Sequence, residues 1–366
     1  MQVLGFDIGG ANIKAATSDG LSCSVPFEMW KRRDELSSQL NSLRQQLCPV
    51  PDVIAIVMTA ELADCFASRA EGVDFIVTAA RDVFSDFIVR IWLTSGEFAE
   101  PEDAIELPQL AAASNWHALA TWAARAAPQG PALLIDIGST TVDLIPILNG
   151  TPQPQGLSDL ERLRQHELIY TGVRRTPVCA IVREVPLVDA DGSEEMVPIA
   201  AELFATSLDV HLIVGDLPEN PNDTATADGR PATRSAAMNR LAHMLCCDGT
   251  DLSEEQLRTM AEYIASEQLN QILDAIENRL YYLQTLAAEG AGSTKSGTPA
   301  PRILISGSGA WLGEKALERI DESAVAGVCS LSNMFVRNVS DCAPAFAAAR
   351  LAAERCLDDL LPLNEL

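Results

Sequence analysis

One pattern occurs twice in the 366 residues of the chain, and it constrains the fold more than any other feature of the sequence. Each copy runs from an apolar strand through Asp-Ile-Gly and a small polar turn into a second apolar strand. The copies are GFDIGGANIKAA at residues 5–16 and LLIDIGSTTVDLIPI at residues 133–147. A repeated strand-turn-strand unit predicts two halves that are built alike. The length agrees, because a chain of this size exceeds what one hydrophobic core usually supports.

Both turns are suited to binding phosphate through the backbone. Turns rich in glycine, serine and threonine expose several N–H groups with few side chains in the way. Neither turn has the spacing of a Walker A sequence or of a Rossmann GxGxxG turn before a helix, because β-branched strand residues follow. The sequence therefore predicts two phosphate-binding hairpins, and their expected binding residues are Asp7, Gly9, Gly10, Asn12, Lys14, Gly138, Ser139, Thr140 and Thr141.

An aspartate stands at the start of each turn, and a second charged residue follows it seven positions later. Asp7 and Asp136 end buried strands, so their carboxylates are predicted to face a hydrated Mg²⁺ that bridges phosphate oxygens. Lys14 follows Asp7 and is expected to neutralise phosphate charge. Asp143 takes the corresponding place after Asp136.

The remaining patterns predict how the chain is divided. A third apolar strand ends in SGSGAW and adds Gly307 and Gly309 to the expected phosphate- or nucleotide-binding residues. Helices are predicted at residues 36–47, 109–126, 233–247 and 253–288, while residues 170 to about 228 predict short strands and polar loops. We expect a first lobe at 1–128, a second lobe with inserted substrate loops at 129–342, and a final helix at 343–361 that packs back on the first lobe.

Composition excludes several classes of function. Asp and Glu outnumber Lys and Arg by 51 to 26, and a formal charge of −25 repels nucleic acids and anionic membranes. The nine cysteines are scattered and show no disulfide framework, so a reducing cytoplasm is expected. No membrane span or targeting segment is predicted. The expected partner is a small phosphorylated molecule, and the sequence leaves a homodimer open.

The three glycine motifs, in this order and spacing, resemble those of the actin, sugar kinase and Hsp70 superfamily. That resemblance implies an α/β fold of two ribonuclease H-like lobes with a nucleotide cleft between them, with SGSGAW as the adenosine motif. The second motif is most similar to the hydantoinase A/oxoprolinase branch, which has Asp-Ile-Gly-Gly-Thr-Thr-Thr-Asp. Here Ser139 replaces a glycine and Val142 replaces a threonine.

A narrower resemblance rests on VMTAELAD, AASNWHALA, YTGVRRTPV and DTATADGRPAT. These stretches resemble small hydantoinase-like proteins linked to tetrahydromethanopterin-dependent one-carbon transfer, with Ala60 where a glycine is usual. Archaeal relatives include the methanofuran-biosynthesis synthase that joins an aminomethylfuran diphosphate to the phenol of γ-glutamyltyramine. The resemblance implies a transferase that forms an ether and releases diphosphate.

Several polar residues outside the hairpins are candidates for substrate binding or catalysis. Paired guanidinium groups bind phosphate or carboxylate, although an exposed pair also balances an acidic surface. Glu61 follows a buried parallel strand, where ligands often bind, and a helix-start acid is the alternative. Candidate bases are Glu61, Asp136 and Asp143, and candidate substrate-binding residues are Tyr170, Gly172, Arg174, Arg175, Thr176 and Asp228.

Two other classes of function stay open at this point. One is a small-molecule kinase or an ATP-dependent hydrolase of the hydantoinase or oxoprolinase type, in which ATP supplies the phosphoryl group. The other is a nucleotide-dependent regulatory switch. ATP therefore remains a candidate ligand beside Mg²⁺. The polar segments at 170–176 and 223–232 favour an enzyme over a switch.

Overall fold

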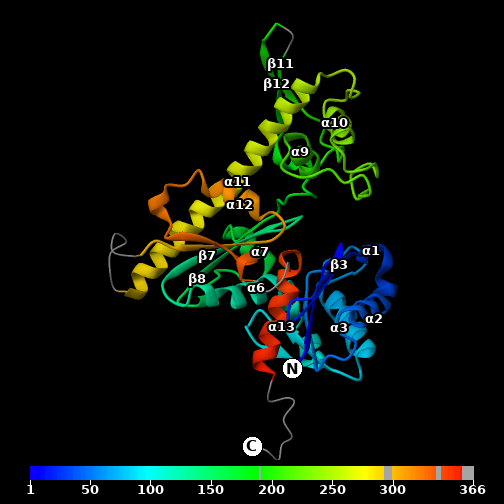
Figure 1. Cartoon of the computed structure of the whole chain (residues 1–366), viewed down its shortest axis with the longest axis vertical. Coiled ribbons are helices and arrows are strands. Elements are labelled where there is room, and N and C mark those ends of the chain that lie inside the picture. Colours follow the sequence, from blue (N-terminus) through cyan, green and yellow to red (C-terminus); the bar gives the residue numbers. More distant parts are fainter. Residues whose placement is uncertain (189–190, 292–298, 335–338, 357–366) are drawn as a thin grey trace, which may run out of the picture.

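Each copy of the repeated hairpin belongs to its own mixed β-sheet (Figure 1). The computed structural model describes residues 1–188, 191–291, 299–334 and 339–356. The first sheet has the order β3-β2-β1-β4-β5-β6, and the second has the order β10-β8-β7-β13-β14, with β9 paired to β8. In both, an antiparallel hairpin is extended on one side by parallel strands. The predicted α/β fold of two ribonuclease H-like lobes is confirmed.

The elements of the first half surround the first sheet. Its strands are β1 (Val3–Ile8), β2 (Asn12–Thr17), β3 (Ser22–Pro26), β4 (Val53–Met58), β5 (Ile88–Trp92) and β6 (Phe98–Ala99). Its helices are α1 (Met29–Arg32), η1 (Arg33–Glu35), α2 (Leu36–Leu47), α3 (Arg69–Val83), α4 (Pro101–Glu106), α5 (Pro108–Ala111), α6 (Asn115–Ala123) and η2 (Ala124–Ala126).

The second half holds the second sheet and a further group of helices. Its strands are β7 (Pro131–Ile137), β8 (Val142–Leu148), β9 (Thr151–Pro152), β10 (Leu168–Ile169), β11 (Glu184–Val188), β12 (Glu194–Pro198), β13 (Arg302–Ser306) and β14 (Gly327–Ser330). Its helices are α7 (Asp159–Arg164), α8 (Val178–Ile181), α9 (Ser207–Val214), α10 (Arg234–His243), α11 (Glu254–Ala291), α12 (Ala310–Leu317), η4 (Glu322–Ala324), η5 (Leu331–Asn333), η6 (Ser340–Cys342) and α13 (Ala343–Arg355).

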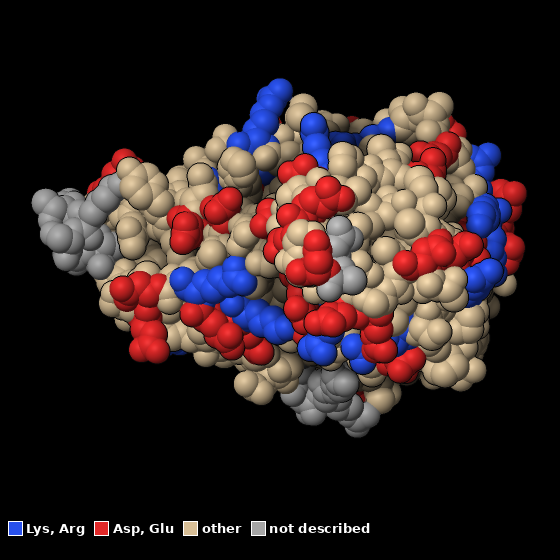
Figure 2. Space-filling model, turned by 90° about the horizontal axis from the view of Figure 1, so that it is seen from above, with Lys and Arg blue, Asp and Glu red and all other residues tan. Residues whose placement is uncertain are grey.

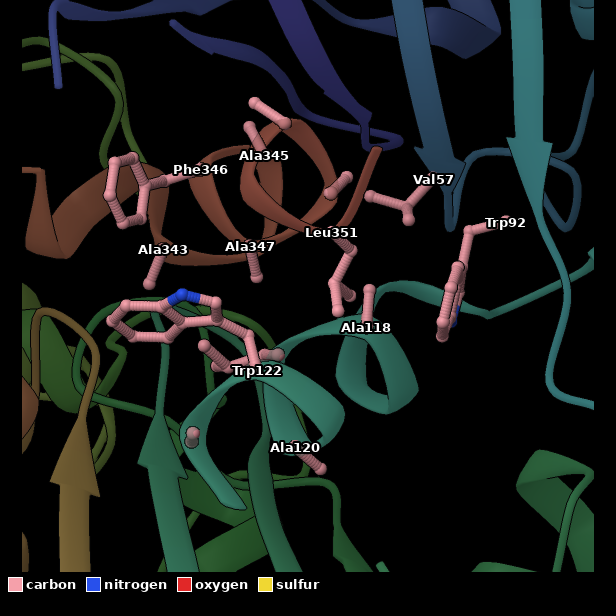
Figure 3. Close-up of a cluster of buried hydrophobic side chains, with 14 of the residues drawn as sticks. Val57, Trp92, Ala118, Ala120, Trp122, Ala343, Ala345, Phe346, Ala347 and Leu351 are labelled. Carbon is pink, nitrogen blue, oxygen red and sulfur yellow. The ribbon is translucent and has the colours of Figure 1, made fainter. Parts of the chain in front are cut away.

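Two alanine-rich helices, α6 and α13, share one hydrophobic core with both sheets (Figure 3). That core includes Val57 of the first sheet and Leu134 of the second. Helix α13 packs against β1, and the fit is close: a Cβ added to Gly5 would lie 2.0 Å from the carbonyl oxygen of Ala345. Small residues on both surfaces allow this backbone contact. Residues 357–361 of the expected final helix lie outside the described residues.

A separate core lies beyond the second sheet and contains α9, α10 and the first part of α11. Helix α11 runs diagonally from this group back along the second sheet, where its later residues pack on β7 and β8 (Figure 1). Helix α9 was not expected from the sequence, which predicted strands and loops there. Its start has a capping box formed by Thr206 and Asp209, and Gly215 ends it with a φ of 88°.

The prediction of a single helix over residues 109–126 is wrong. Helix α5 ends at Ala111 and α6 begins at Asn115, and between them Ala113 has a φ of 47°. Alanine rarely adopts this left-handed conformation, and no glycine or proline between the two helices signals the break. The interruption starts a new helix at Asn115, whose side chain interacts with Asp7 of the first hairpin.

The charged residues and the cysteines lie in the structure as their numbers in the sequence led us to expect. On the face in Figure 2, Lys and Arg side chains lie among Asp and Glu side chains. All nine cysteines are free thiols. Among the described residues, no helix is both long and apolar enough to cross a bilayer.

Candidate functional site

Four charged side chains from the two hairpins face the layer between the sheets. Val3 of β1 belongs to the shared core, and Asp7 lies on the same face because side chains alternate along a strand. Lys14 pairs with Asp7 across β1 and β2. Asp136 lies on the face of β7 that contributes to the same core, and Asp143 pairs with it on β8. Strand periodicity therefore brings the charges of both hairpins into one layer.

These groups interact electrostatically across the two lobes. Burial raises the pKa of Asp7, and it is opposed by Lys14, whose Nζ lies 3.7 Å from Asp7 Oδ2, and by Asn115. Burial raises the pKa of Asp136 to about 6, and Asp143 adds to the rise. Burial lowers the pKa of Lys14, but the carboxylates of Asp7 and Asp136 outweigh it, so that this pKa is raised.

One carboxylate oxygen of each hairpin aspartate lacks a hydrogen-bond partner. Oδ1 of Asp7 and Oδ1 of Asp136 are buried and unpartnered within the described part of the chain. Buried polar atoms normally have partners, so a ligand is expected here. No group of three or more His, Cys, Asp or Glu side chains among the described residues is arranged to hold a metal alone. The two carboxylates fit Mg²⁺, which usually keeps waters or phosphate oxygens in its shell.

The backbone of both hairpins turns in the same way. In the first, Gly9 N–H donates to the carbonyl oxygen of Asn12 at 3.0 Å, and in the second, Gly138 N–H donates to that of Thr141 at 2.9 Å. Each bond encloses two further residues. The enclosed N–H groups without an acceptor in residues 1–188, 191–291, 299–334 and 339–356 are those of Gly10, Ala11, Ser139 and Thr140. Successive free N–H groups in a turn form an anion-binding nest.

The segment at residues 170–176 packs against the second hairpin. Arg175 N–H donates to the carbonyl oxygen of Ser139 at 2.9 Å. A Cβ on Gly172 would lie 2.5 Å from the nitrogen of Thr140, so only glycine allows the two backbones to approach this closely. The structure therefore joins two motifs that are separate in sequence.

Thr176 has a structural role within that segment. Its side chain is buried, and its hydroxyl accepts from Gly172 N–H at 2.8 Å. The hydroxyl also donates to the carbonyl oxygen of Gly172 at 3.3 Å. Thr176 therefore stabilises the turn that carries Gly172, and no contact in the described chain directs it toward a substrate.

The third glycine motif lies at the end of β7, beside Asp136. Gly307 has a φ of 88°, and a Cβ there would lie 2.9 Å from Asp136 Oδ1. Gly309 N–H donates to the carbonyl oxygen of Ile137 at 2.8 Å. The motif therefore adjoins the second hairpin, while its predicted role in binding phosphate or nucleotide stays a prediction.

Asp143 is held by an arginine that the sequence analysis did not single out. Arg162 is buried, hydrogen bonds to Asp143, and places its Cζ 4.1 Å from the ring centroid of Trp116. The ion pair with Arg162 therefore occupies one carboxylate oxygen of Asp143. The spacing of Arg162 in α7 gives no sign of this pairing, which depends on how α7 folds over β8.

Glu61 is buried in the loop after β4. Ala60 N–H of this loop donates to the carbonyl oxygen of Ile8 at 3.1 Å, which ties the loop to the first hairpin. Glu61 is 1% exposed, and neither of its carboxylate oxygens has a hydrogen-bond partner in the described chain. The alternative role as a helix-start acid does not apply, because α3 begins at Arg69 with Ser68 as its cap.

The pKa of Glu61 is raised to about 7, and burial is the main cause. The N–H groups of Glu61 itself and of Ala113 oppose the rise. They lie near the carboxylate without reaching hydrogen-bond geometry in the part of the chain that the structure describes. The carboxyl group therefore changes its charge near neutral pH.

Two of the substrate-binding candidates lie where the lobes meet. Arg175 is exposed and reaches across to the first lobe, with its Cζ 5.8 Å from the ring centroid of Trp30. Tyr170 is 66% exposed and interacts electrostatically with Glu61 of the first lobe. Both side chains are therefore available to a ligand bound at this junction.

Two other candidates are engaged in the second half of the chain instead. Arg174 forms an ion pair with Asp223. The carboxylate of Asp228 accepts from Arg240 Nη1 at 2.9 Å, and Arg240 is also paired with the buried Asp209. These last contacts adjoin the core of α9 and α10. No contact among the described residues brings Asp228 to the hairpins.

Comparison with known proteins gives one family and two related enzymes. The family model described as hydantoinase/oxoprolinase matches residues 52–354. A Methanocaldococcus jannaschii protein, named (4-{4-[2-(gamma-L-glutamylamino)ethyl]phenoxymethyl}furan-2-yl)methanamine synthase, is 28% identical over 96% of this chain and 97% of its own length. A Methanococcus vannielii protein of the same name is 29% identical over 60% of this chain and 89% of its own length.

Solved structures resemble the chain more distantly. The nucleotide-free structure of an acetone carboxylase aligns with a TM-score of 0.49 and 12% identity, over 95% of this chain and 70% of that chain. Both related enzymes above are named as synthases, in agreement with the transferase expected from the sequence.

Proposed function

The chain belongs to the hydantoinase/oxoprolinase family, and from that premise we propose that it is a synthase of methanofuran-type cofactor biosynthesis. The proposed reaction joins an aminomethylfuran diphosphate to the phenol of γ-glutamyltyramine. The product named for the M. jannaschii relative contains this phenoxymethyl-furan ether, and the relative aligns over nearly its whole length. The proposal places the protein in tetrahydromethanopterin-linked one-carbon metabolism.

The observation that carries the proposal is the pair of hairpins that face one layer. Each offers turn N–H groups and one buried, unpartnered carboxylate oxygen, from Asp7 and from Asp136. A ligand with two linked phosphates has anionic oxygens for both turns. Lys14 adds a positive charge beside them. These features support a diphosphate ligand without requiring ATP.

In the proposed reaction, the bond between the furfuryl carbon and the diphosphate oxygen breaks, and the phenolic oxygen forms a bond to the same carbon. The phenol loses its proton. N–H groups of Gly10 and Ser139 would bind the departing phosphates and stabilise the charge that develops on them. Mg²⁺ held by Asp7 and Asp136 would supply further charge neutralisation when bound. A cytoplasmic location is part of the proposal, supported by the free thiols.

Thermal stabilisation tests which phosphate ligand the hairpins bind. The melting temperature is measured with the aminomethylfuran diphosphate and with ATP, each with and without Mg²⁺. A ligand at a hundredfold its dissociation constant stabilises the folded state by about 2.7 kcal/mol. We expect Mg²⁺-dependent stabilisation by the furan diphosphate, which is lost in Asp136→Asn and retained in the exposed control Asp86→Asn. Stabilisation by ATP alone would instead support a kinase or an ATP-dependent hydrolase.

A further inference from the structure

Of the three candidate bases, Glu61 has the carboxylate with the fewest hydrogen-bond and ion-pair partners. Both of its carboxylate oxygens are buried without partners among the described residues, whereas Asp143 is paired with Arg162. Asp136 keeps one unpartnered oxygen but belongs to the second hairpin, whose turn is expected to bind phosphate. A polar group that is buried without partners destabilises the fold unless a ligand supplies the missing hydrogen bond. Glu61 is therefore free to act on the other reactant.

The backbone holds Glu61 in a fixed position. Helix α3 passes so close that a Cβ on Gly72 would lie 2.3 Å from the carbonyl oxygen of Glu61 and 2.6 Å from its Cα. The loop is also tied to Ile8, the last residue of β1 before the turn of the first hairpin. The carboxylate thus lies on a rigid loop beside the hairpin turn, which suits a group that must meet a reactant in one geometry.

The surroundings of Glu61 come from both lobes. The charged groups that influence it are Asp159 of α7 and Arg69 at the start of α3. Tyr170 of the second lobe interacts with Glu61, Asp159 and Arg175. The exposed Tyr170 therefore lies within electrostatic range of both the Glu61 carboxylate and the exposed Arg175 guanidinium. An aromatic ring packs against another aromatic ring, and a guanidinium pairs with a carboxylate.

We propose that Glu61 is the general base for the acceptor phenol, which binds at the junction of the lobes between Glu61 and Tyr170. This rests on the proposed function. The phenolic O–H gives its proton to a carboxylate oxygen of Glu61 as the oxygen bonds to the furfuryl carbon. Diphosphate leaves with the electrons of the broken C–O bond, and Glu61 then releases the proton to solvent. Arg175 pairs with the carboxylate of the glutamyl group.

The protonation of Glu61 suits this role. Its pKa is about 7, mainly because of burial, and within that value Asp159 raises it and Arg69 lowers it. A base is most effective when its pKa lies near the operating pH. The rate of the wild-type enzyme should therefore fall as the pH drops below about 7, with one ionisation on the acid side of the profile.

The first test replaces Glu61 with glutamine. We expect kcat to fall by about 10²–10⁴-fold and the ionisation on the acid side to disappear, while the affinity for the furan diphosphate stays unchanged. An acceptor with an electron-withdrawing ring substituent ionises more easily, so it should restore part of the lost rate. Wild-type kcat and pH profile in Glu61→Gln, or no rescue by the acidic phenol, would overturn the proposal.

The second test shifts the ionisation instead of removing it. Asp159→Asn should move the acid side of the profile to lower pH, and Arg69→Gln should move it to higher pH, because the two charges act on Glu61 in opposite directions. Glu167→Gln is the matched control. Glu167 is equally buried but accepts from two backbone N–H groups, so its loss should reduce stability and leave the profile in place.

The outcomes separate this inference from the proposed function. If the wild-type protein forms no ether from the two substrates, the proposed function fails and the inference falls with it. If the ether forms but the profile is insensitive to Glu61, Asp159 and Arg69, the inference fails alone.

Discussion

At the scale of single residues, the burial that suits Glu61 to act as a base also lowers the stability of the folded protein. Its folded pKa of about 7 lies above the ordinary value of 4.5, so the folded state binds its proton more tightly than the unfolded state. The stabilisation that comes from this proton is fully present below pH 4.5 and is lost as the pH rises through about 7. At neutral pH a buried, partly charged carboxylate is thus retained at a cost in stability, as is common at active sites.

The free energy of unfolding gives a direct check of this cost. Relative to Glu61→Gln, we expect the wild-type protein to lose up to about 3 kcal/mol between pH 4.5 and pH 8. Urea denaturation of both proteins at the two pH values measures the change, and common losses from other acids cancel in the difference. A difference that does not vary with pH would show that Glu61 titrates as an ordinary exposed acid.

Residue types and spacing were enough to predict the hairpin residues but not their partners. Asp7 and Asp136 stand out because each interrupts an apolar strand before glycine. Asn115 and Arg162 carry no such signal, since their contacts depend on how separate elements pack. Glu61 was one of three candidate bases, and only the burial of its unpartnered carboxylate distinguishes it.

At the scale of elements, the second hairpin depends on the segment at residues 170–176. Gly172 touches the backbone of Thr140, and Gln268 of α11 holds the same segment by donating to the carbonyl oxygen of Gly172 at 2.9 Å. Gln268 also contacts His211 of α9. The position of the hairpin is therefore connected to helices that belong to a separate core.

Gly172→Ala tests this support. The added Cβ would meet a backbone nitrogen 2.5 Å away, which cannot move aside as a flexible side chain would. We expect a loss of about 1–3 kcal/mol in stability. Loss of one hydrogen bond to a charged phosphate costs about 1.5–3 kcal/mol, so diphosphate affinity should fall about tenfold to a hundredfold.

Titration with the furan diphosphate and denaturation with urea measure both effects. Gly313→Ala in α12 is the control, because its Cβ would be 3.4 Å from the nearest atom and alanine favours a helix. Equal affinity in Gly172→Ala and the wild-type protein would contradict a role for this segment in holding the hairpin.

Elements were predictable where the pattern was long and regular. Helix α2 follows its helical spacing, strands β1, β4 and β7 coincide with apolar runs, and α11 is long, as its pattern predicted. The break before α6 was not predictable, because Ala113 adopts a left-handed conformation that its residue type disfavours. Packing of α6 between the sheets stabilises that conformation where local preference does not.

At the scale of the whole molecule, two similar sheets share a core through α6 and α13 and direct their hairpins toward one layer. The repeat in the sequence predicted two similar sheets, because each copy supplies the first two strands of a separate sheet. The shared core could not be read from the sequence, since alanine-rich stretches suit any closely packed helix. The reaction proposed for the chain depends on both lobes, with phosphate held by the hairpins and the phenol by Glu61 and Tyr170.

The most direct test of the account is whether the purified wild-type protein makes the ether without ATP. The aminomethylfuran diphosphate and γ-glutamyltyramine are incubated with the protein and Mg²⁺, and the ether and diphosphate are quantified by mass spectrometry and a diphosphate assay. We expect equal amounts of ether and diphosphate, with no requirement for ATP. Absence of the ether, or its formation only when ATP is consumed, would contradict it.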